Sequence, residues 1–172
     1  MASAPMTVVL GIDPGLASTG YGVVEVAPNR FRHLTHGVIT TDSASPLGTR
    51  LVRLYEELSA ILQEYRPSAA GVEALYFARN ATSLIPVAEA RGVVLLGLSR
   101  HGIEAAEYTP QQIKQAVVGQ GKAEKEQVQD VVRLLLGLPE RPEPDHASDA
   151  LAAAICHAHN ADFAERLARA RE

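Results

Sequence analysis

Four residues have side chains and sequence positions suited to binding a divalent cation. Asp13 is the first charged residue of the chain and ends the apolar segment TVVLGID, and Glu73 likewise ends the segment AAGVE. His146 and Asp149 stand three residues apart, which places them on one face of a helix. Ionised side chains are costly to bury unless they are paired or bind a metal. We therefore expect these four side chains to meet in one metal site.

A site of this composition is suited to phosphodiester hydrolysis. A pair of divalent ions ~3.5–4 Å apart can activate a water molecule and stabilise the leaving oxygen of an in-line displacement. Carboxylate oxygens favour Mg²⁺ or Mn²⁺, and the softer imidazole of His146 predicts that Mn²⁺ is well tolerated. Asp145 precedes His146 and could take its place as a ligand. Each residue alone also has a structural explanation, as a turn residue, an ion-pair partner or a helix cap, so the prediction depends on their combination.

Basic residues are concentrated in short segments although the net charge of the chain is −4. All of its lysines, which are Lys114, Lys122 and Lys125, lie within one stretch, and Arg79 lies in a second basic stretch, residues 76–100. Local positive charge of this kind indicates a surface for a polyanion. The alternative is a chance cluster on a solvated face.

The spacing of apolar and turn residues predicts the elements that position these side chains. Strands are expected over residues 7–13, 21–26, 31–40, 69–73 and 103–108, the first three in an antiparallel meander. Helices are expected from Pro46 to about Tyr65, from an N-cap at Thr82 to about Arg100, after the capping box at Thr109, over residues 123–136, and from near His146 past His159. This order predicts an α/β fold, with a mixed five-stranded sheet flanked by helices.

Length and composition limit the other possibilities. The 172 residues fit a single domain over 1–172, in which residues 160–172 form a charged tail that either extends the last helix or frays. A hydrophobic content of 47% with 21% charged residues argues against disorder. No apolar run approaches the ~20 residues that a membrane-spanning helix needs. The single cysteine, Cys156, excludes an internal disulfide, so we expect a cytoplasmic location.

Four segments together resemble the RuvC family of Holliday junction resolvases, from Val8 to about His159. They are LGIDPGLASTGYGVV, GVEALYFARNATS, IKQAVVGQGKAEKEQVQ and DHASDALAAAICHAH. The resemblance implies an RNase H-like fold and a homodimeric endonuclease that resolves four-way DNA junctions by paired symmetric nicks, in recombination and DNA repair. It implies that Asp13, Glu73 and Asp149 are catalytic carboxylates that hold Mg²⁺ or Mn²⁺, a pair of ions in each site. His146 stands where many members carry an aspartate.

The same resemblance implies which residues bind DNA and which proteins are the partners of the chain. Lys114 and Lys125 match basic residues of the family's DNA-binding surface, and Tyr76 matches an aromatic residue that contacts the junction near its centre. We add Lys122 and Arg79 as DNA-binding candidates because they lie in the basic segments. The implied protein partners are the RuvA and RuvB branch-migration proteins.

Two other functions are weighed against the nuclease. Asp-Pro-Gly followed by Gly20 resembles the phosphate-holding hairpin of actin-like and sugar-kinase-like phosphotransferases, but those folds need a second domain that 172 residues do not accommodate. A non-catalytic nucleic-acid-binding or processing factor of the same fold gains nothing from acidic groups that face phosphate. Cys156, His157 and His159 are expected to be ordinary helix residues, because neighbouring positions on a helix do not converge.

Overall fold

A computed structural model of the chain describes residues 6–28, 30–75 and 81–169. Its strands are β1 (Thr7–Asp13), β2 (Ser18–Ala27), β3 (Arg30–Thr40), β4 (Ala69–Glu73) and β5 (Ala105–Tyr108). Its helices are α1 (Leu47–Tyr65), α2 (Ala81–Arg100), α3 (Pro110–Val118), α4 (Lys125–Leu136) and α5 (Asp145–Arg169). No helix in the described ranges is long and apolar enough to cross a membrane.

The strands form one five-stranded sheet in the order β3-β2-β1-β4-β5. β1, β2 and β3 pair antiparallel, whereas β4 is parallel to both β1 and β5. Because Ile12 is in register with Val72, β1 and β4 end side by side at the same edge of the sheet. The predicted α/β fold with a mixed five-stranded sheet is therefore confirmed, and its topology brings the ends of β1 and β4 together.

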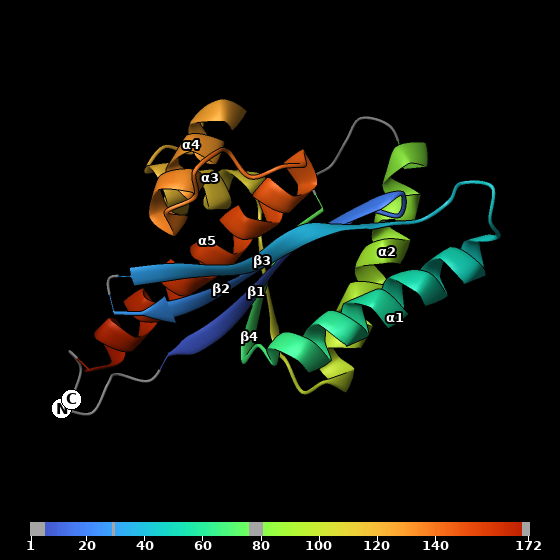
Figure 1. Cartoon of the computed structure of the whole chain (residues 1–172), viewed down its shortest axis with the longest axis horizontal. Helices are drawn as coiled ribbons and strands as arrows, with labels where there is room; N and C mark the ends of the chain where they lie inside the picture. The colour runs from blue at the N-terminus through green and yellow to red at the C-terminus, as the bar shows by residue number, and fades with distance from the viewer. Residues whose placement is uncertain (1–5, 29, 76–80, 170–172) are drawn as a thin grey trace.

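Helices cover both faces of the sheet (Figure 1). α1 and α2 pack on one face, where Leu10 and Ile12 of β1 point, and α3, α4 and α5 pack on the other, where Val9 points. This alternation follows from the two-residue period of a strand. α1 buries Leu54 and Leu58, which lie one turn apart on its apolar stripe.

Helix α5 lies unusually close to the strands. A methyl group on Gly11 of β1 would overlap the Ala150 carbonyl, and one on Gly71 of β4 would lie 2.6 Å from the Ala153 carbonyl oxygen. Glycines on the sheet and alanines on α5 thus permit the helix to approach closely, and they set the distance between α5 and the central strands. The first turn of α5 is thereby held at the ends of β1 and β4.

Most predicted elements are confirmed, with differences at their ends. The capping box at Thr109 is present: its hydroxyl accepts from the Gln112 amide, and the Gln112 side chain accepts from the Thr109 amide. The prediction that Thr82 caps a helix was wrong, because α2 already includes this residue. The last predicted strand was too long at its start, because the Ile103 N–H bonds the Leu98 carbonyl at the end of α2.

Candidate active site

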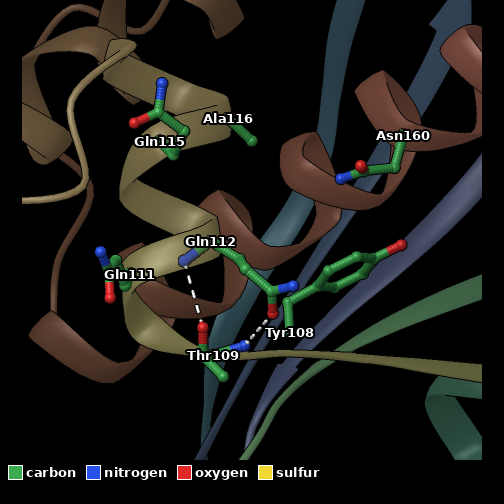
Figure 2. A pocket seen from close by; sticks show the side chains of 7 residues that line it. All are labelled: Tyr108, Thr109, Gln111, Gln112, Gln115, Ala116 and Asn160. Atoms are coloured by element: carbon green, nitrogen blue, oxygen red, sulfur yellow. Dashed lines mark hydrogen bonds between the residues drawn. The ribbon is translucent and has the colours of Figure 1, made fainter.

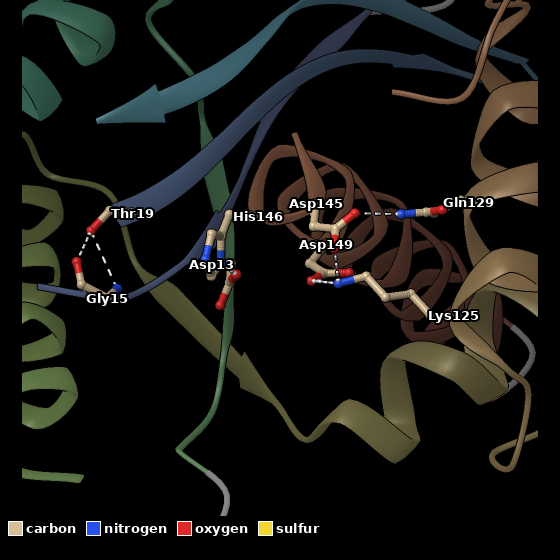
Figure 3. A network of polar contacts seen from close by, with 8 residues as sticks. All are labelled: Asp13, Gly15, Thr19, Lys125, Gln129, Asp145, His146 and Asp149. Carbon is tan, nitrogen blue, oxygen red and sulfur yellow. Dashed lines mark hydrogen bonds and ion pairs between the residues drawn. The ribbon is translucent and has the colours of Figure 1, made fainter. Parts of the chain in front are cut away.

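The predicted acidic residues and the histidine lie at one edge of the sheet. Asp13 ends β1, Glu73 ends the neighbouring parallel strand β4, and His146 and Asp149 lie in the first turns of α5. In Figure 3, the His146 ring and the Asp13 carboxylate face each other, and Asp149 lies on the side of Lys125. The folded chain therefore gathers side chains that are far apart in sequence.

The contact between His146 and Asp13 is direct. Nδ1 of His146 lies 2.7 Å from Oδ2 of Asp13, and the Asp13 side chain is only 16% exposed. If the neutral ring donates its Nδ1 proton to the carboxylate, the lone pair remains on Nε2 and can bind a metal. Asp145 does not make the contact with Asp13 in place of His146, since it contacts Lys125 and Gln129 instead.

Gly20 is a positioning residue that sequence reasoning missed. It is the cross-strand partner of Asp13, and a methyl group there would overlap the carbonyl of His146. The absence of a side chain therefore lets the start of α5 lie against β2, beside Asp13. The available signal was a glycine inside a strand, which often marks close approach of another backbone.

The segment after Asp13 is fixed by a reciprocal pair of hydrogen bonds (Figure 3). The Thr19 hydroxyl donates to the Gly15 carbonyl at 2.6 Å and accepts from the Gly15 amide at 3.3 Å. The Thr19 residue is 1% exposed, so these bonds are shielded from water. They hold the turn that carries the chain from β1 to β2 directly beyond the site.

Lys125 of α4 enters the acidic cluster. Its Nζ lies 3.3 Å from Oδ2 of Asp149 and 3.1 Å from Oδ2 of Asp145. The other oxygen of Asp145 accepts a 3.1 Å hydrogen bond from Nε2 of Gln129. Sequence reasoning placed Lys125 on a DNA-binding surface but did not connect it to Asp149 or to Gln129.

The carboxylates repel one another in a partly buried setting. Burial, the negative charges of Asp13 and Asp149, and a hydrogen bond with Asp13 raise the pKa of Glu73 to about 8. Burial also raises the pKa of Asp13, although the contact with His146 opposes this. Without a cation, the site therefore holds more negative charge than its surroundings stabilise.

The donor set suits a divalent cation, but the side chains are arranged around other partners. Within residues 6–28, 30–75 and 81–169, no three His, Cys, Asp or Glu side chains are gathered closely enough to hold a metal ion as they stand. His146 lies against Asp13 and Lys125 lies against Asp149. Carboxylate oxygens with one imidazole nitrogen match the preferences of Mg²⁺ and Mn²⁺, and a cation would relieve the repulsion that raises the pKa of Glu73.

The remaining DNA-binding candidates are spread over the chain. Tyr76 and Arg79 lie outside the described residues. Lys114 is half-buried on α3, and Lys122 is exposed in the turn before α4. Among the basic candidates in the described residues, it is Lys125 that contacts carboxylates, those of Asp145 and Asp149.

A cavity of about 380 Å³ lies elsewhere, between the end of β5, α3 and α5 (Figure 2). Three of its amide side chains are already bonded within the protein: Gln112 caps α3, Gln115 bonds both Gly119 and Gly121, and Asn160 donates to the Cys156 carbonyl. None of the lining side chains that the structure describes is an acid, a base or a histidine, so the acidic cluster is the stronger candidate for an active site.

The side chains of Cys156, His157 and His159 each have their own partners or surroundings. His157 pairs with the Tyr108 hydroxyl at 2.9 Å, and His159 lies 3.0 Å from the Ala116 carbonyl oxygen. Cys156 is buried, and burial raises the pKa of its thiol to about 11. Each side chain therefore has separate surroundings on α5.

A mixed sheet of this order, with acidic residues at the ends of β1 and β4 and at the start of α5, defines an RNase H-like nuclease. The family model described as "Crossover junction endodeoxyribonuclease RuvC" matches residues 9–157. The chain therefore belongs to the RuvC family, and the resemblance found in its sequence is confirmed.

Individual relatives agree with this assignment. A crossover junction endodeoxyribonuclease RuvC of Treponema denticola is 52% identical over 157 residues, which cover 91% of this chain and 88% of the relative. One of Caldanaerobacter subterraneus is 48% identical, covering 95% of this chain and 99% of the relative. Among solved structures, Thermus thermophilus RuvC in complex with Holliday junction substrate matches with a TM-score of 0.88 and 39% identity, covering 92% of this chain and 96% of that chain.

Proposed function

We propose that this chain is a structure-specific endonuclease that resolves Holliday junctions by paired symmetric nicks, in recombination and DNA repair. The main support is the position of Asp13, Glu73, His146 and Asp149 at the adjacent ends of β1 and β4 and at the start of α5, within the region, residues 9–157, that matches the RuvC family. The Thermus thermophilus relative, with 39% identity, was solved in complex with Holliday junction substrate. A four-way DNA junction is accordingly the proposed substrate of this chain.

In this proposal Asp13, Glu73, His146 and Asp149 hold the metal, and Mg²⁺ or Mn²⁺ fits their donor atoms. A pair of such ions would supply Lewis-acid activation of water and of the scissile phosphate. His146 keeps its ring orientation through the bond to Asp13. Lys125 pairs with Asp149 while no metal is bound, and in the loaded site its ammonium would contact a phosphate oxygen of the bound strand.

DNA binding is assigned to the basic residues and one aromatic residue. Lys114, Lys122, Lys125 and Arg79 would contact phosphates, which makes binding dependent on salt concentration. Tyr76 would stack on a base near the junction centre, an interaction of ~1–3 kcal/mol that tolerates any sequence.

We further propose that the chain acts as a homodimer in the cytoplasm, with RuvA and RuvB as partners. A four-way junction has approximate two-fold symmetry, and an isologous dimer presents an identical site to each of two opposing strands. Paired nicks follow from this arrangement, because each protomer would contribute one site to one of the two strands.

The test is incubation of a synthetic mobile four-way junction with the protein and Mg²⁺ or Mn²⁺, beside a linear duplex of the same sequence. Paired nicks on opposing strands of the junction, with the duplex left intact, are expected. Equal cutting of both substrates would reject structure specificity, and binding without cutting would favour a non-catalytic binding factor of the same fold.

A further inference from the structure

We propose that Gln129 and Asp145 form a positioning pair that holds the Lys125 ammonium at the active site once a divalent cation occupies Asp149. This inference rests on the proposed function and deepens it. Neither Gln129 nor Asp145 needs to touch metal or DNA in this role. Both act through Lys125.

The geometry gives each oxygen of Asp145 its own partner. Oδ2 lies 3.1 Å from Nζ of Lys125, and Oδ1 accepts from Nε2 of Gln129 at 3.1 Å. Lys125 and Gln129 are one turn apart on α4, so they present their side chains to Asp145 from the same helix face. The carboxylate is thus held at two points, as Figure 3 shows.

Burial distinguishes the two ends of this arrangement. The Asp145 side chain is 67% exposed and that of Lys125 is 44% exposed, whereas Gln129 is only 9% exposed. An exposed ion pair alone contributes little, because long side chains lose entropy and water screens the charges. The buried amide of Gln129 provides the rigid point from which the Asp145 carboxylate, and then Lys125, is oriented.

Lys125 contacts two carboxylates, of which one is a proposed metal ligand and the other is not. Asp149 is a proposed metal ligand, and a divalent cation bound there repels the ammonium. Asp145 contacts Lys125 and Gln129 but makes no described contact with Asp13, so its carboxylate remains a partner for Lys125 in the loaded site. In the metal-free site the carboxylates of Asp145 and Asp149 both hold the Lys125 ammonium. In the metal-loaded site Asp145 alone of these two holds it.

This difference makes the role testable without relying on cleavage. Gln129→Met removes the amide while preserving charge and approximate size, and Asp145→Asn weakens the partner itself. Asp130→Asn is the matched control, because Asp130 neighbours Gln129 and its carboxylate binds Arg141 of the connection before α5. It removes a charge from the same region without touching Lys125.

Junction affinity is measured for each variant in Ca²⁺, used as a divalent ion for binding without turnover, and in EDTA. We expect Gln129→Met and Asp145→Asn to weaken binding about three- to tenfold in Ca²⁺, with wild-type affinity in EDTA, where Asp149 still holds Lys125. Asp130→Asn should match the wild type in both conditions. Combined with Lys125→Ala, neither Gln129→Met nor Asp145→Asn should cause further loss.

Equal affinity of Gln129→Met and the wild type in Ca²⁺ would overturn the proposal. So would a loss that is the same in EDTA, or one that persists when Lys125→Ala is present, because either result shows a role that does not pass through the lysine.

Mn²⁺ binding by calorimetry adds a further check, since Gln129→Met should leave it unchanged within about twofold. In turnover, Gln129→Met should lower kcat/KM about three- to tenfold at saturating Mn²⁺, and unchanged kcat/KM would contradict the proposal. If the wild type binds but never cuts a junction, the proposed nuclease function fails, while the Ca²⁺ comparison still decides the role of Gln129.

Discussion

Nδ1 of His146 lies 2.7 Å from Oδ2 of Asp13, and this contact joins side chains 133 positions apart in the chain. It connects the first turn of α5 to the end of β1, so the fold of the whole sheet determines whether the site forms. The bond also sets the ring orientation of His146 and, in the neutral ring, leaves the Nε2 lone pair available to a metal.

Asp13→Asn should reduce cleavage of a four-way junction by at least about a hundredfold, because it removes a charged ligand and the carboxylate that contacts His146. Junction binding should be largely retained, since the substitution removes negative charge that faces phosphate. Single-turnover cleavage and a binding titration measure the two effects. Loss of binding with an unchanged melting temperature would indicate a recognition role for Asp13 instead.

Gly20→Ala should impair cleavage, because the added methyl group would displace the His146 carbonyl and with it the ring that contacts Asp13. Gly48→Ala on α1 is the control, since a methyl group there meets no atom within 4 Å. It should leave cleavage and the melting temperature unchanged or slightly raise the latter, since alanine is a better helix former than glycine. Wild-type turnover by Gly20→Ala would show that the close approach of α5 to β2 is dispensable.

The raised pKa of Glu73 predicts how the metal-free protein responds to pH. Between its ordinary pKa of 4.5 and the folded value of about 8, the folded state binds more protons than the unfolded state, so stability falls as pH rises. Glu73→Gln should remove part of this slope, up to about 1.4 kcal/mol per pH unit for a full proton. Urea unfolding in EDTA from pH 5 to pH 9 measures it, with those pH limits set roughly by the two pKa values. Identical slopes for the two proteins would show that Glu73 titrates normally.

Lys114→Ala and Lys125→Ala should each weaken junction binding and lower the slope of log affinity against log salt by about 1. Arg53→Ala is the control, because Arg53 lies on α1 at the opposite face of the sheet and pairs with Glu57. It should leave the slope unaltered. A wild-type slope for either lysine variant would mean that this lysine makes no phosphate contact.

The strands and the acidic residues at their ends were predictable because their patterns are local. Apolar segments that end in Asp13 and Glu73 are visible in the sequence, and so is the capping box at Thr109. The contacts of Lys125 were not predictable, because they depend on how α4 packs on α5 through residues such as Val132. Sequence spacing places Lys125 and Gln129 on one helix face but does not say which acids that face meets.

The role of Gly20 was hidden for the same reason. Sequence shows a glycine within a strand, but only the packing of α5 on the sheet shows that the His146 carbonyl fills the space of its missing side chain. Asp145 and His146 likewise were interchangeable candidates in the sequence. The first turn of α5 separates them, since it directs His146 to Asp13 and Asp145 to Lys125.

The central claim is that Asp13, Glu73, His146 and Asp149 bind divalent cations together. A crystal of the protein soaked in Mn²⁺ and measured at the manganese absorption edge tests it most directly. We predict anomalous density within about 2.0–2.4 Å of oxygens from both Asp13 and Asp149, with Lys125 moved away from Asp149 and still bound to Asp145. Manganese bound elsewhere, or carboxylates of Asp13 and Asp149 that share no ion, would contradict the account.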